Sequence, residues 1–422
     1  MITVCIPDDI LSLDMYRLAG RRHKRHVYKS AIAAIAILVA VAMGCLASYK
    51  LWPIARVVSV ASTPTRIQAH AVSIKSNTLF TGNIYFGRYI NDWSMASPLQ
   101  YAYPFSRLSE FDRTKYDAWI AGLECPTVAG VHLTSAEEDA TLNFNCNPQY
   151  ITEAAKWFTI FTLANNHTDN QGVAGFSETQ QHLAANGIQY FGHPDPRELN
   201  DLCDVIALPT KVTLSNGSTE QAAIPVAMCG YHAFIRLPSS EAISVMNEYS
   251  KYMPVIAMSH AGTEYKPAPD AIKTSLYRSM IDSGADMVLG DHPHWVQTTE
   301  SYKGHLIVYS MGNFMFDQQG SLELTRSAAI NVEFSVQGAD TSLLAKWLVL
   351  GKTCGTYHDD CLAQAKAEQL AKLPFTFKFG VVGSDDSNRI TKPASAAIQA
   401  GILQRMKWVE TMNQLQTPYS SL

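Results

Sequence analysis

The sequence is poor in charged residues and has no excess of basic ones. Asp, Glu, Lys and Arg make up 17% of its 422 residues, and the net charge is −4. A protein that binds nucleic acid carries a basic patch or stripe, so this charge balance argues against a nucleic-acid partner. The chain also has no internal repeat and no low-complexity tract, and its 47% hydrophobic content is typical of a folded protein.

Cysteines are few, and no two of them form a C-x-x-C pair, which argues against a zinc ribbon or thioredoxin-like chemistry. Two of the eight, Cys5 and Cys45, lie near the N-terminus. In an oxidising compartment the other six would allow three disulfides. Six cysteines allow fifteen connectivities, and buried free thiols are the alternative. Proximity in the sequence suggests the pairs Cys125–Cys146, Cys203–Cys229 and Cys354–Cys361.

One segment lacks charge altogether, because no Asp, Glu, Lys or Arg falls between Lys29 and Lys50. About 20 apolar helical residues cross the hydrocarbon core of a bilayer. The basic run at 21–26 favours a cytoplasmic N-terminus. We therefore expect a single-pass protein of the plasma membrane with an extracytoplasmic main domain, and a cleaved signal peptide is the alternative. The expected parts are a cytoplasmic tail at 1–29, a transmembrane helix at 30–50 and a stalk at 51–75.

Beyond the stalk, short apolar strands alternate with helices, which indicates an α/β domain. We assign this domain to 76–385. A C-terminal helical segment follows at 386–422, with Ser395 as a candidate N-cap. Three later segments alternate more strongly and predict antiparallel strands that extend or cover the sheet. They are 328–335, 343–350 and 375–382.

Polar residues that suit a metal site follow four of the apolar strands. Two histidines follow the strand that ends at Gly290, and a carboxylate, a carboxamide and a third histidine lie at three other strand ends. In open α/β sheets, sites form beyond the carboxyl ends of the strands, so we expect one common site. Mixed nitrogen and oxygen donors favour one or two Zn²⁺, Mn²⁺ or Fe²⁺ ions over Ca²⁺. The candidate donors are Glu124, Asn166, His260, His292 and His294.

His167 directly follows Asn166 in the sequence. If Asn166 binds a metal ion, His167 lies close to it and is a candidate general acid toward a leaving group. The alternative is that His167 caps a helix or sits in a loop. In the same way, Glu124 could be a solvated loop charge.

In this order, the clusters resemble those of the CapA family of poly-γ-glutamate capsule proteins, which has a calcineurin-like metallophosphatase fold. The matching runs are 81–88, 122–126, 163–169, 187–192, 260–265, 290–294 and 309–314. The resemblance implies a β-sandwich flanked by helices, with a metal site at the strand ends. It also implies that Glu124 bridges two ions, that His167 is the acid, and that Arg88 contacts an anion. Asn313 would orient a ligand or support the site.

The chain departs from the family pattern in its first motif, where Gly82-Asn83 stands in place of Gly-Asp. The amide oxygen of Asn83 can bind a metal ion but brings no negative charge, so this metal position should be weakened or lost. Asp92 and Asp117 are the nearby carboxylates that could substitute. The family's His-Trp-Gly run is also replaced, by 260–262, which keeps the imidazole and loses an aromatic wall.

We therefore expect a membrane-anchored, metal-dependent hydrolase or transferase of capsule or poly-γ-glutamate synthesis or export. It would act on an anionic surface polymer or a phosphoester, and the fold does not fix which. The alternative, motivated by Asn83, is a catalytically weakened subunit that binds and guides polymer in a capsule synthesis complex. The expected partners are thus an anionic polymer such as poly-γ-glutamate, the membrane and proteins of such a complex.

Overall fold

The computed structural model describes residue 67 and residues 70–355 and 360–422. The expected tail, the expected transmembrane helix and most of the expected stalk lie outside these residues and stay predictions. In the described part of the chain, no helix is both long and apolar enough to cross a membrane. Residues 62–422 belong to one compact unit, which carries every predicted site residue.

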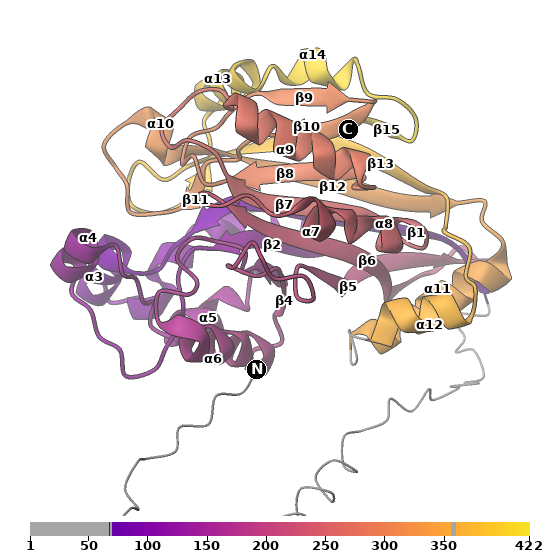
Figure 1. Ribbon diagram of the computed structural model, residues 1–422, viewed down its shortest axis with the longest axis horizontal. Helices are drawn as coiled ribbons and strands as arrows, with labels where there is room; N and C mark the ends of the chain where they lie inside the picture. The colour runs from indigo at the N-terminus through magenta and orange to yellow at the C-terminus, as the bar shows by residue number, and fades with distance from the viewer. Residues whose placement is uncertain (1–66, 68–69, 356–359) are drawn as a thin grey trace, which may run out of the picture. The chain divides into compact units, whose positions relative to one another are not determined.

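A long mixed sheet runs through this unit (Figure 1). Its strand order is β14-β13-β12-β1-β5-β6-β7-β8-β10-β9. The neighbours from β6 to β10 run parallel, whereas those from β13 to β6 run antiparallel. The strands are β1 (Ala71–Ile84), β5 (Cys203–Leu214), β6 (Thr219–Ala233), β7 (Val255–Ala261), β8 (Met287–Asp291), β9 (Thr299–Tyr302), β10 (His305–Val308), β12 (Arg326–Gln337), β13 (Phe375–Asp385) and β14 (Lys392–Pro393).

Shorter strands form a second layer with the end of β1. They are β2 (Ala118–Leu123), β3 (Ile160–Thr162) and β4 (Gln189–Phe191), all parallel, and β11 (Asn313–Met315), which pairs with β1. β1 belongs to both layers, because its first residues pair with β5 and β12 and its last with β2 and β11. The layers touch where Gly192 meets Gly230, since a Cβ on either would lie 2.8 Å from the other's Cα. This mixed α/β architecture fits the expected metallophosphatase-like fold.

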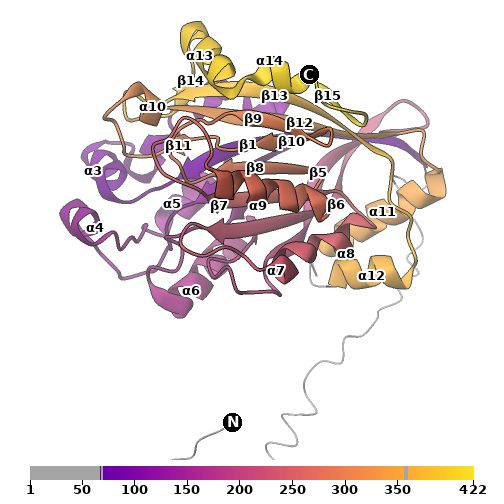
Figure 2. The same ribbon diagram turned by 45° about the horizontal axis from the view of Figure 1, so that its top comes forward.

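Helices flank the two layers (Figures 1 and 2). On the side of β2 to β4 lie α3 (Arg88–Ala96), α4 (Ser135–Thr141), α5 (Gln149–Ala154) and α6 (Gly172–Ala185), with 3₁₀ turns at Gln100–Phe105, Leu108–Phe111 and Arg113–Lys115. Along β6 to β8 lie α7 (Ser240–Ser244), α8 (Met246–Ser250) and α9 (Ala271–Asp282). The later helices are α10 (Leu322–Thr325), α11 (Thr341–Cys354), α12 (Cys361–Ala367), α13 (Ala396–Met406) and α14 (Trp408–Met412).

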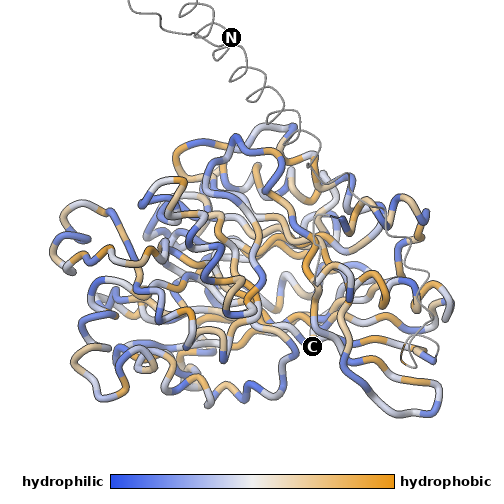
Figure 3. The backbone as a smooth tube through the Cα atoms, turned by 90° about the horizontal axis from the view of Figure 1, so that it is seen from below, coloured by the Kyte–Doolittle hydropathy of each residue, from blue (hydrophilic) through white to orange (hydrophobic). Residues whose placement is uncertain are grey.

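Two apolar clusters form the core, and Figure 3 shows the hydrophobic segments crossing the interior. Successive side chains of a strand point to opposite faces, and β2 divides its residues accordingly. Ile120 packs in the cluster shared with β6, β7 and β8, whereas Trp119 packs with Phe158 and Tyr150 beneath the helices of the other side. The carboxyl end of β2 is therefore held from both faces, which fixes the position of Glu124.

The prediction of a strand at 343–350 is wrong, because these residues lie in helix α11. Asp340 caps this helix by accepting the backbone N–H of Leu343. A short apolar run satisfies both the strand and the helix period, so its pattern alone does not separate them. The buried residues of α11 instead follow helical spacing and include Leu344, Trp347, Leu348 and Gly351. The predicted strands at 328–335 and 375–382 are confirmed as parts of β12 and β13.

The folded domain extends beyond both of its expected boundaries. β1 begins at Ala71, so residues 71–75 belong to the sheet rather than to the stalk, and they pair with β5 and β12. The segment 386–422 is not only helical, because β14 and β15 (Tyr419–Ser421) pair with β13. The predicted N-cap is confirmed, since Ser395 accepts the backbone N–H of Ile398.

The three disulfides suggested by sequence proximity are all confirmed. They join Cys125 to Cys146, Cys203 to Cys229 and Cys354 to Cys361. The first lies directly beside Glu124 and ties the end of β2 to the segment that precedes α5. The second joins residues that are direct partners in the antiparallel pair of β5 and β6.

Candidate metal centre at the strand ends

The six predicted donors gather beyond the carboxyl ends of parallel strands. Asn83 and His260 lie near the ends of β1 and β7. Glu124 directly follows β2, and Asn166 lies in the segment after β3. The remaining donors, His292 and His294, follow β8. A continuous set of polar contacts joins these positions, so strand ends far apart in the sequence meet in one group.

His260 is at the centre of this group. Its Nδ1 lies 2.8 Å from Oδ1 of Asp291, and its Nε2 lies 2.7 Å from Oδ1 of Asn166. Nδ1 of His292 is 3.0 Å from the same Nε2. Nδ1 of His260 also lies 3.2 Å from the amide nitrogen Nδ2 of Asn165. A neutral imidazole carries one N–H, which either the Asp291 carboxylate at Nδ1 or the Asn166 oxygen at Nε2 can accept.

Nε2 of His260 meets two further atoms that can bind a metal ion. The carboxamide oxygen of Asn166 and Nδ1 of His292 both lie within hydrogen-bonding distance of it. Metal-binding histidines typically donate their other ring N–H to a carboxylate or a carbonyl group, and Asp291 is placed to accept such an N–H from His260. Ring nitrogens and an amide oxygen gathered in this way can bind a cation.

Further polar contacts extend the group toward β1 through His294, Asn313 and Asn83. Nδ1 of His294 lies 2.8 Å from Oδ1 of Asn313, and Nδ2 of Asn83 lies 3.5 Å from the same oxygen. Nε2 of both His292 and His294 faces the Glu264 carboxylate, at 4.0 and 3.8 Å. The resemblance implied a supporting role for Asn313, and its contacts with two candidate donors agree with that role.

Three buried atoms of the predicted donors have no hydrogen-bond partner among the described residues. They are Oδ1 of Asn83, Oε2 of Glu124 and Nε2 of His292. A buried polar atom without a partner costs about 1–3 kcal/mol, and a bound ion is one of the usual reasons that such an atom is kept. These three atoms come from three different strand ends, so the donor set fits a divalent ion.

The backbone of the His-x-His run is strained. His292 has φ 86° and His294 has φ 60°, in the left-handed region that non-glycine residues rarely adopt. Each such residue costs on the order of 1–3 kcal/mol and persists only where the surroundings enforce it. The N–H of Tyr265 donates to the carbonyl of Pro293 between them, and Met311 donates to Gly290. The fold therefore holds both imidazoles in place at an energetic cost, as functional sites commonly do.

Burial strongly perturbs the carboxyl groups of the site. Burial raises the pKa of Glu124 well above its ordinary value, and the nearby Asp291 raises it further, while a hydrogen bond from Asn165 lowers it. Burial raises the pKa of Asp291 to about 7. Burial also lowers the pKa of the Lys273 amine, which sits behind Asp291, to about 7. Binding of a cation would favour the ionised carboxylates, so such carboxyl groups would lose their protons to solvent when the cation binds.

Asn83 is buried at the position where the family carries an aspartate, and neither suggested substitute is near it. Asp92 lies on α3, where it accepts the hydroxyl of Ser135. Asp117 lies at the opposite end of β2 from Glu124 and pairs with Lys211. Both candidates are therefore wrong as local replacements for the missing charge.

The two predicted catalytic residues share a neighbour at the edge of the group. His167 lies against the ring of Phe144, with centroids 4.1 Å apart, and the Arg88 guanidinium lies 4.9 Å from that ring. Burial lowers the pKa of His167 to about 4, so its ring is neutral at pH 7. Arg88 is paired with Asp317 and Asp139. Both roles, acid and anion contact, stay predictions.

In the described ranges, no three His, Cys, Asp or Glu side chains are arranged to hold a metal ion by themselves. The group instead mixes imidazoles with asparagine oxygens. The sequence interpretation missed three of its members, although each lies inside a quoted motif: Asp291, Asn165 and Glu264. Asn165 lies next to His260 and accepts the backbone N–H of His167, so it links two of the motifs.

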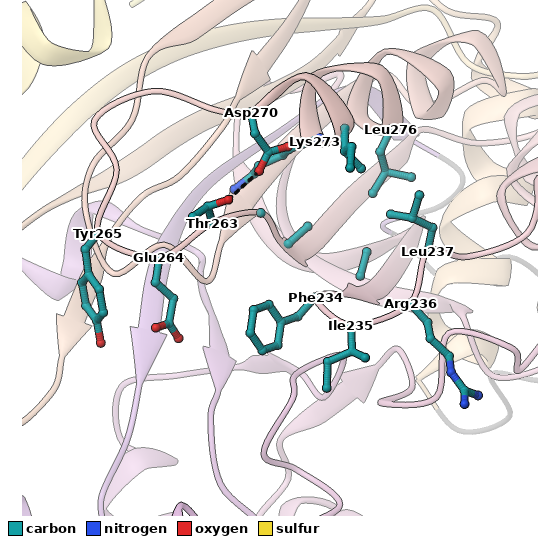
Figure 4. A pocket seen from close by; sticks show the side chains of 14 residues that line it. Phe234, Ile235, Arg236, Leu237, Thr263, Glu264, Tyr265, Asp270, Lys273 and Leu276 are labelled. Atoms are coloured by element: carbon teal, nitrogen blue, oxygen red, sulfur yellow. Dashed lines mark hydrogen bonds between the residues drawn. The ribbon is translucent and has the colours of Figure 1, made fainter.

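A cavity of about 680 Å³ lies beside the group. Its walls come from the segment after β6 and the loop between β7 and α9 (Figure 4). Phe234 and Glu264 line the cavity and also contact the candidate donors. The Phe234 ring lies 4.4 Å from that of His292, and Glu264 faces His292 and His294. Arg236 points away from Glu264 at the other end of the cavity. A ligand in the cavity would therefore reach the candidate donors.

Residues 77–224 and 235–318 match the family described as bacterial capsule synthesis protein PGA_cap. The matched segments amount to more than half of the chain and contain all eight predicted site residues. The chain belongs to this family.

Named relatives agree with this membership. The chain is 29% identical over 269 residues to the PGA biosynthesis protein CapA of Bacillus subtilis (strain 168), which covers 61% of this chain and 67% of that protein. It is 24% identical over 296 residues to the capsule biosynthesis protein CapA of Bacillus anthracis, covering 65% and 67%. The uncharacterized protein y4sH of Sinorhizobium fredii matches over 70 residues at 34% identity, 17% of this chain and 15% of that protein. The chain is thus a CapA-family protein of the capsule and poly-γ-glutamate synthesis group.

Proposed function

We propose that this CapA-family protein is a metal-dependent hydrolase or transferase that acts on an anionic surface polymer during capsule or poly-γ-glutamate synthesis. We place its activity outside the plasma membrane, to which the segment at 30–50 would anchor it. The observation that carries the proposal is the gathering of an amide oxygen and a second imidazole nitrogen around Nε2 of His260. The family membership supports the polymer class.

The residues that would hold a divalent ion are the six predicted donors, with imidazoles from His260, His292 and His294. When bound, such an ion supplies Lewis acidity that polarises a phosphoryl or carbonyl oxygen and activates water. Glu124 keeps a buried oxygen, Oε2, that has no hydrogen-bond partner among the described residues. Asp291 fixes the orientation of the His260 ring through its bond to Nδ1.

The remaining residues supply positioning and proton transfer. His167 is neutral in the free protein because burial depresses its pKa. A negatively charged leaving group beside the ring would raise that pKa and let His167 carry a proton. The cavity bounded by Phe234 and Glu264 supports binding of a substrate segment next to the histidines and exclusion of water from them.

The test uses the full-length chain, freed of metal with a chelator and then dialysed against Mn²⁺, Zn²⁺ or Fe²⁺. Bound metal is measured by elemental analysis, and activity is measured on bis(p-nitrophenyl) phosphate and on poly-γ-glutamate. The proposal predicts at least one ion per chain and turnover of one of these substrates. His292→Ala should lose both without unfolding the metal-free protein, because a core of this size does not need a metal ion to fold.

The matched control is Asp286→Asn, at the start of β8 and far from the donors, which should keep both metal and turnover. Less than one ion per chain and no turnover would overturn the proposal. A second candidate function is then favoured by the neutral side chain of Asn83: a subunit that binds and guides polymer without cleaving it. That function predicts poly-γ-glutamate binding that is unchanged by the chelator.

A further inference from the structure

Asp291 lies between two residues of the run 290–294 and had no predicted role, yet its side chain lies in the middle of the site. Its side chain is almost fully buried, with the whole residue 4% exposed. Oδ1 lies 2.8 Å from Nδ1 of His260, its direct partner residue in the pairing of β7 and β8. This carboxyl group therefore contacts the ring at the centre of the group.

The other carboxylate oxygen reaches across to the second layer. A Cβ built on Gly122 would lie 2.5 Å from Oδ2 of Asp291. Only glycine leaves room for the carboxylate at this position of β2. Gly122 is the register partner of Asn83 in the pairing of β1 and β2, and β8 also contacts β1. The Asp291 carboxylate thus lies beside the strand position that pairs with Asn83.

An ion pair with Lys273 is the alternative role for a buried aspartate. The Lys273 amine donates to the backbone carbonyl of Asp291, at 3.3 Å, and not to its carboxylate. The carboxylate is directed instead toward His260 and Gly122, which belong to the two layers that meet at the site. The charge of Lys273 nevertheless lowers the pKa of Asp291, so the carboxyl group faces both the site and the lysine.

We propose that Asp291 supplies from β8 the negative charge that Asn83 fails to supply from β1, and that it positions His260 for a divalent cation. The inference rests on the proposed function, because it concerns the same ion. It explains how a chain that lacks the first-motif aspartate keeps a carboxylate in the site. It also makes Asn83 and Asp291 a reciprocal pair, in which either residue can carry the charge.

The proposed relation between Asn83 and Asp291 can be tested by moving the carboxylate from position 291 to position 83. Mn²⁺ and Zn²⁺ affinities are measured by isothermal titration calorimetry on the full-length, metal-free chain. Asp291→Asn should weaken binding by about 10- to 100-fold, the usual effect of losing a carboxylate that orients a metal-binding histidine. Asn83→Asp combined with Asp291→Asn should recover the part of that affinity that is due to the charge, because it restores a carboxylate but not the contact with Nδ1 of His260. Asp286→Asn, which removes a carboxylate at the other end of the same strand, should bind as the wild type does.

A second readout does not depend on added metal. Long-range ¹H–¹⁵N correlation spectra of the metal-free chain should show His260 protonated at Nδ1, and Asp291→Asn should shift that tautomer. Thermal unfolding of each variant checks that it is folded. The inference is overturned if Asp291→Asn binds metal as tightly as the wild type, if the double variant binds no better than Asp291→Asn, or if His260 is protonated at Nε2.

The outcomes separate this inference from the proposed function. If the variants bind metal in the predicted pattern while no substrate is turned over, this result contradicts the proposed reaction and supports the role of Asp291. A wild-type chain that binds neither ion overturns both. Turnover with equal metal affinity in the wild type and Asp291→Asn supports the function and overturns the inference.

Discussion

Arg88 and Asp317 form a two-point ion pair that links the first matching run, 81–88, to the segment just after the last one, 309–314. Nε of Arg88 donates to Oδ2 of Asp317 at 2.8 Å, and Nη2 donates to Oδ1 at 2.7 Å. The two side chains are only 10% and 2% exposed. Arg88 also has φ 39°, and its backbone N–H donates to Glu138. The pair holds the start of α3 against the segment that follows β11.

Breaking this buried pair should strongly destabilise the domain. Arg88→Met leaves the Asp317 carboxylate buried without its guanidinium, which typically costs about 3–5 kcal/mol. Arg88→Met combined with Asp317→Leu removes both charges and should recover most of that loss. Free energies of unfolding from urea titrations measure both effects. Arg278→Met is the control, because its pair with Glu300 is 45% and 23% exposed and should contribute at most about 1 kcal/mol.

The double variant also tests the predicted anion contact. If Arg88 serves only the ion pair, the stable double variant should keep its substrate affinity. A stable double variant with a raised KM and an unchanged kcat would identify Arg88 as a substrate contact in addition. Equal costs for Arg88→Met and Arg278→Met would contradict the structural role described above.

The disulfide beside Glu124 should matter more for stability than the one at the end of α11. Cross-linking removes entropy from the unfolded chain, and the effect grows with the length of the closed loop. Cys125–Cys146 closes a separation of 21 residues and Cys354–Cys361 one of 7. Replacing the first pair by alanines should cost about 3 kcal/mol and should also weaken metal binding. Replacing Cys354 and Cys361 by alanines should lower the free energy of unfolding, measured in urea, by less and should leave metal binding unchanged. A larger loss for this second pair than for the first would refute the ranking.

The sequence predicted the strand-end group from the rule that sites form beyond the carboxyl ends of strands in α/β folds. The ends before Glu124 and Asn166 lie at the same edge because β2 and β3 are parallel. His260 comes from the other layer, so its contact with Asn166 also depends on how the two layers pack. Neighbouring cysteines likewise predicted all three disulfides. Periodicity did not resolve 343–350, because a short apolar run on a buried helix gives the same pattern as a buried strand.

Other features depended on packing between layers, which a single sequence does not show. Asp291 looked like part of a turn, and only the pairing of β7 with β8 and the approach of β2 brought its carboxylate to His260 and Gly122. The Arg88 side chain looked free for an anion, because Asp317 lies 229 residues away in the sequence. Contacts of this range are set by tertiary structure rather than by local pattern.

The stability of the metal-free protein should fall with acidification in a way that depends on His167. Burial lowers its pKa from 6.5 to about 4 in the folded state. Between these values the unfolded chain binds a proton at this residue and the folded chain does not. The contribution is therefore fully present above pH 6.5 and is lost as the pH falls toward 4. His167→Gln should reduce the slope of unfolding free energy against pH in this window.

The raised pKa of Asp291 acts in the opposite direction. Its folded carboxyl group keeps a proton up to about pH 7, so its contribution favours the folded state more at lower pH. It is present in both wild type and His167→Gln and cancels in their difference. Urea titrations with a chelator at several pH values measure that difference, and the exposed His132, changed to Gln, is the control. Identical slopes for the wild type and His167→Gln would contradict the burial of a neutral imidazole.

The crowding of Gly122 by Asp291 can be measured directly as a coupling between two substitutions. Gly122→Ala places a methyl group 2.5 Å from Oδ2 of Asp291, and overpacking of this kind costs about 1–3 kcal/mol. Asp291→Ala removes the carboxylate and frees that space, so adding Gly122→Ala to it should cost little. Urea titrations of the four proteins give the coupling energy, which should be about 0.5–3 kcal/mol for residues in contact. Gly320→Ala is the control, because a Cβ there has no atom nearer than 3.9 Å. Additive costs would mean that the carboxylate does not occupy the space beside Gly122, and the charge would then lie elsewhere in the site.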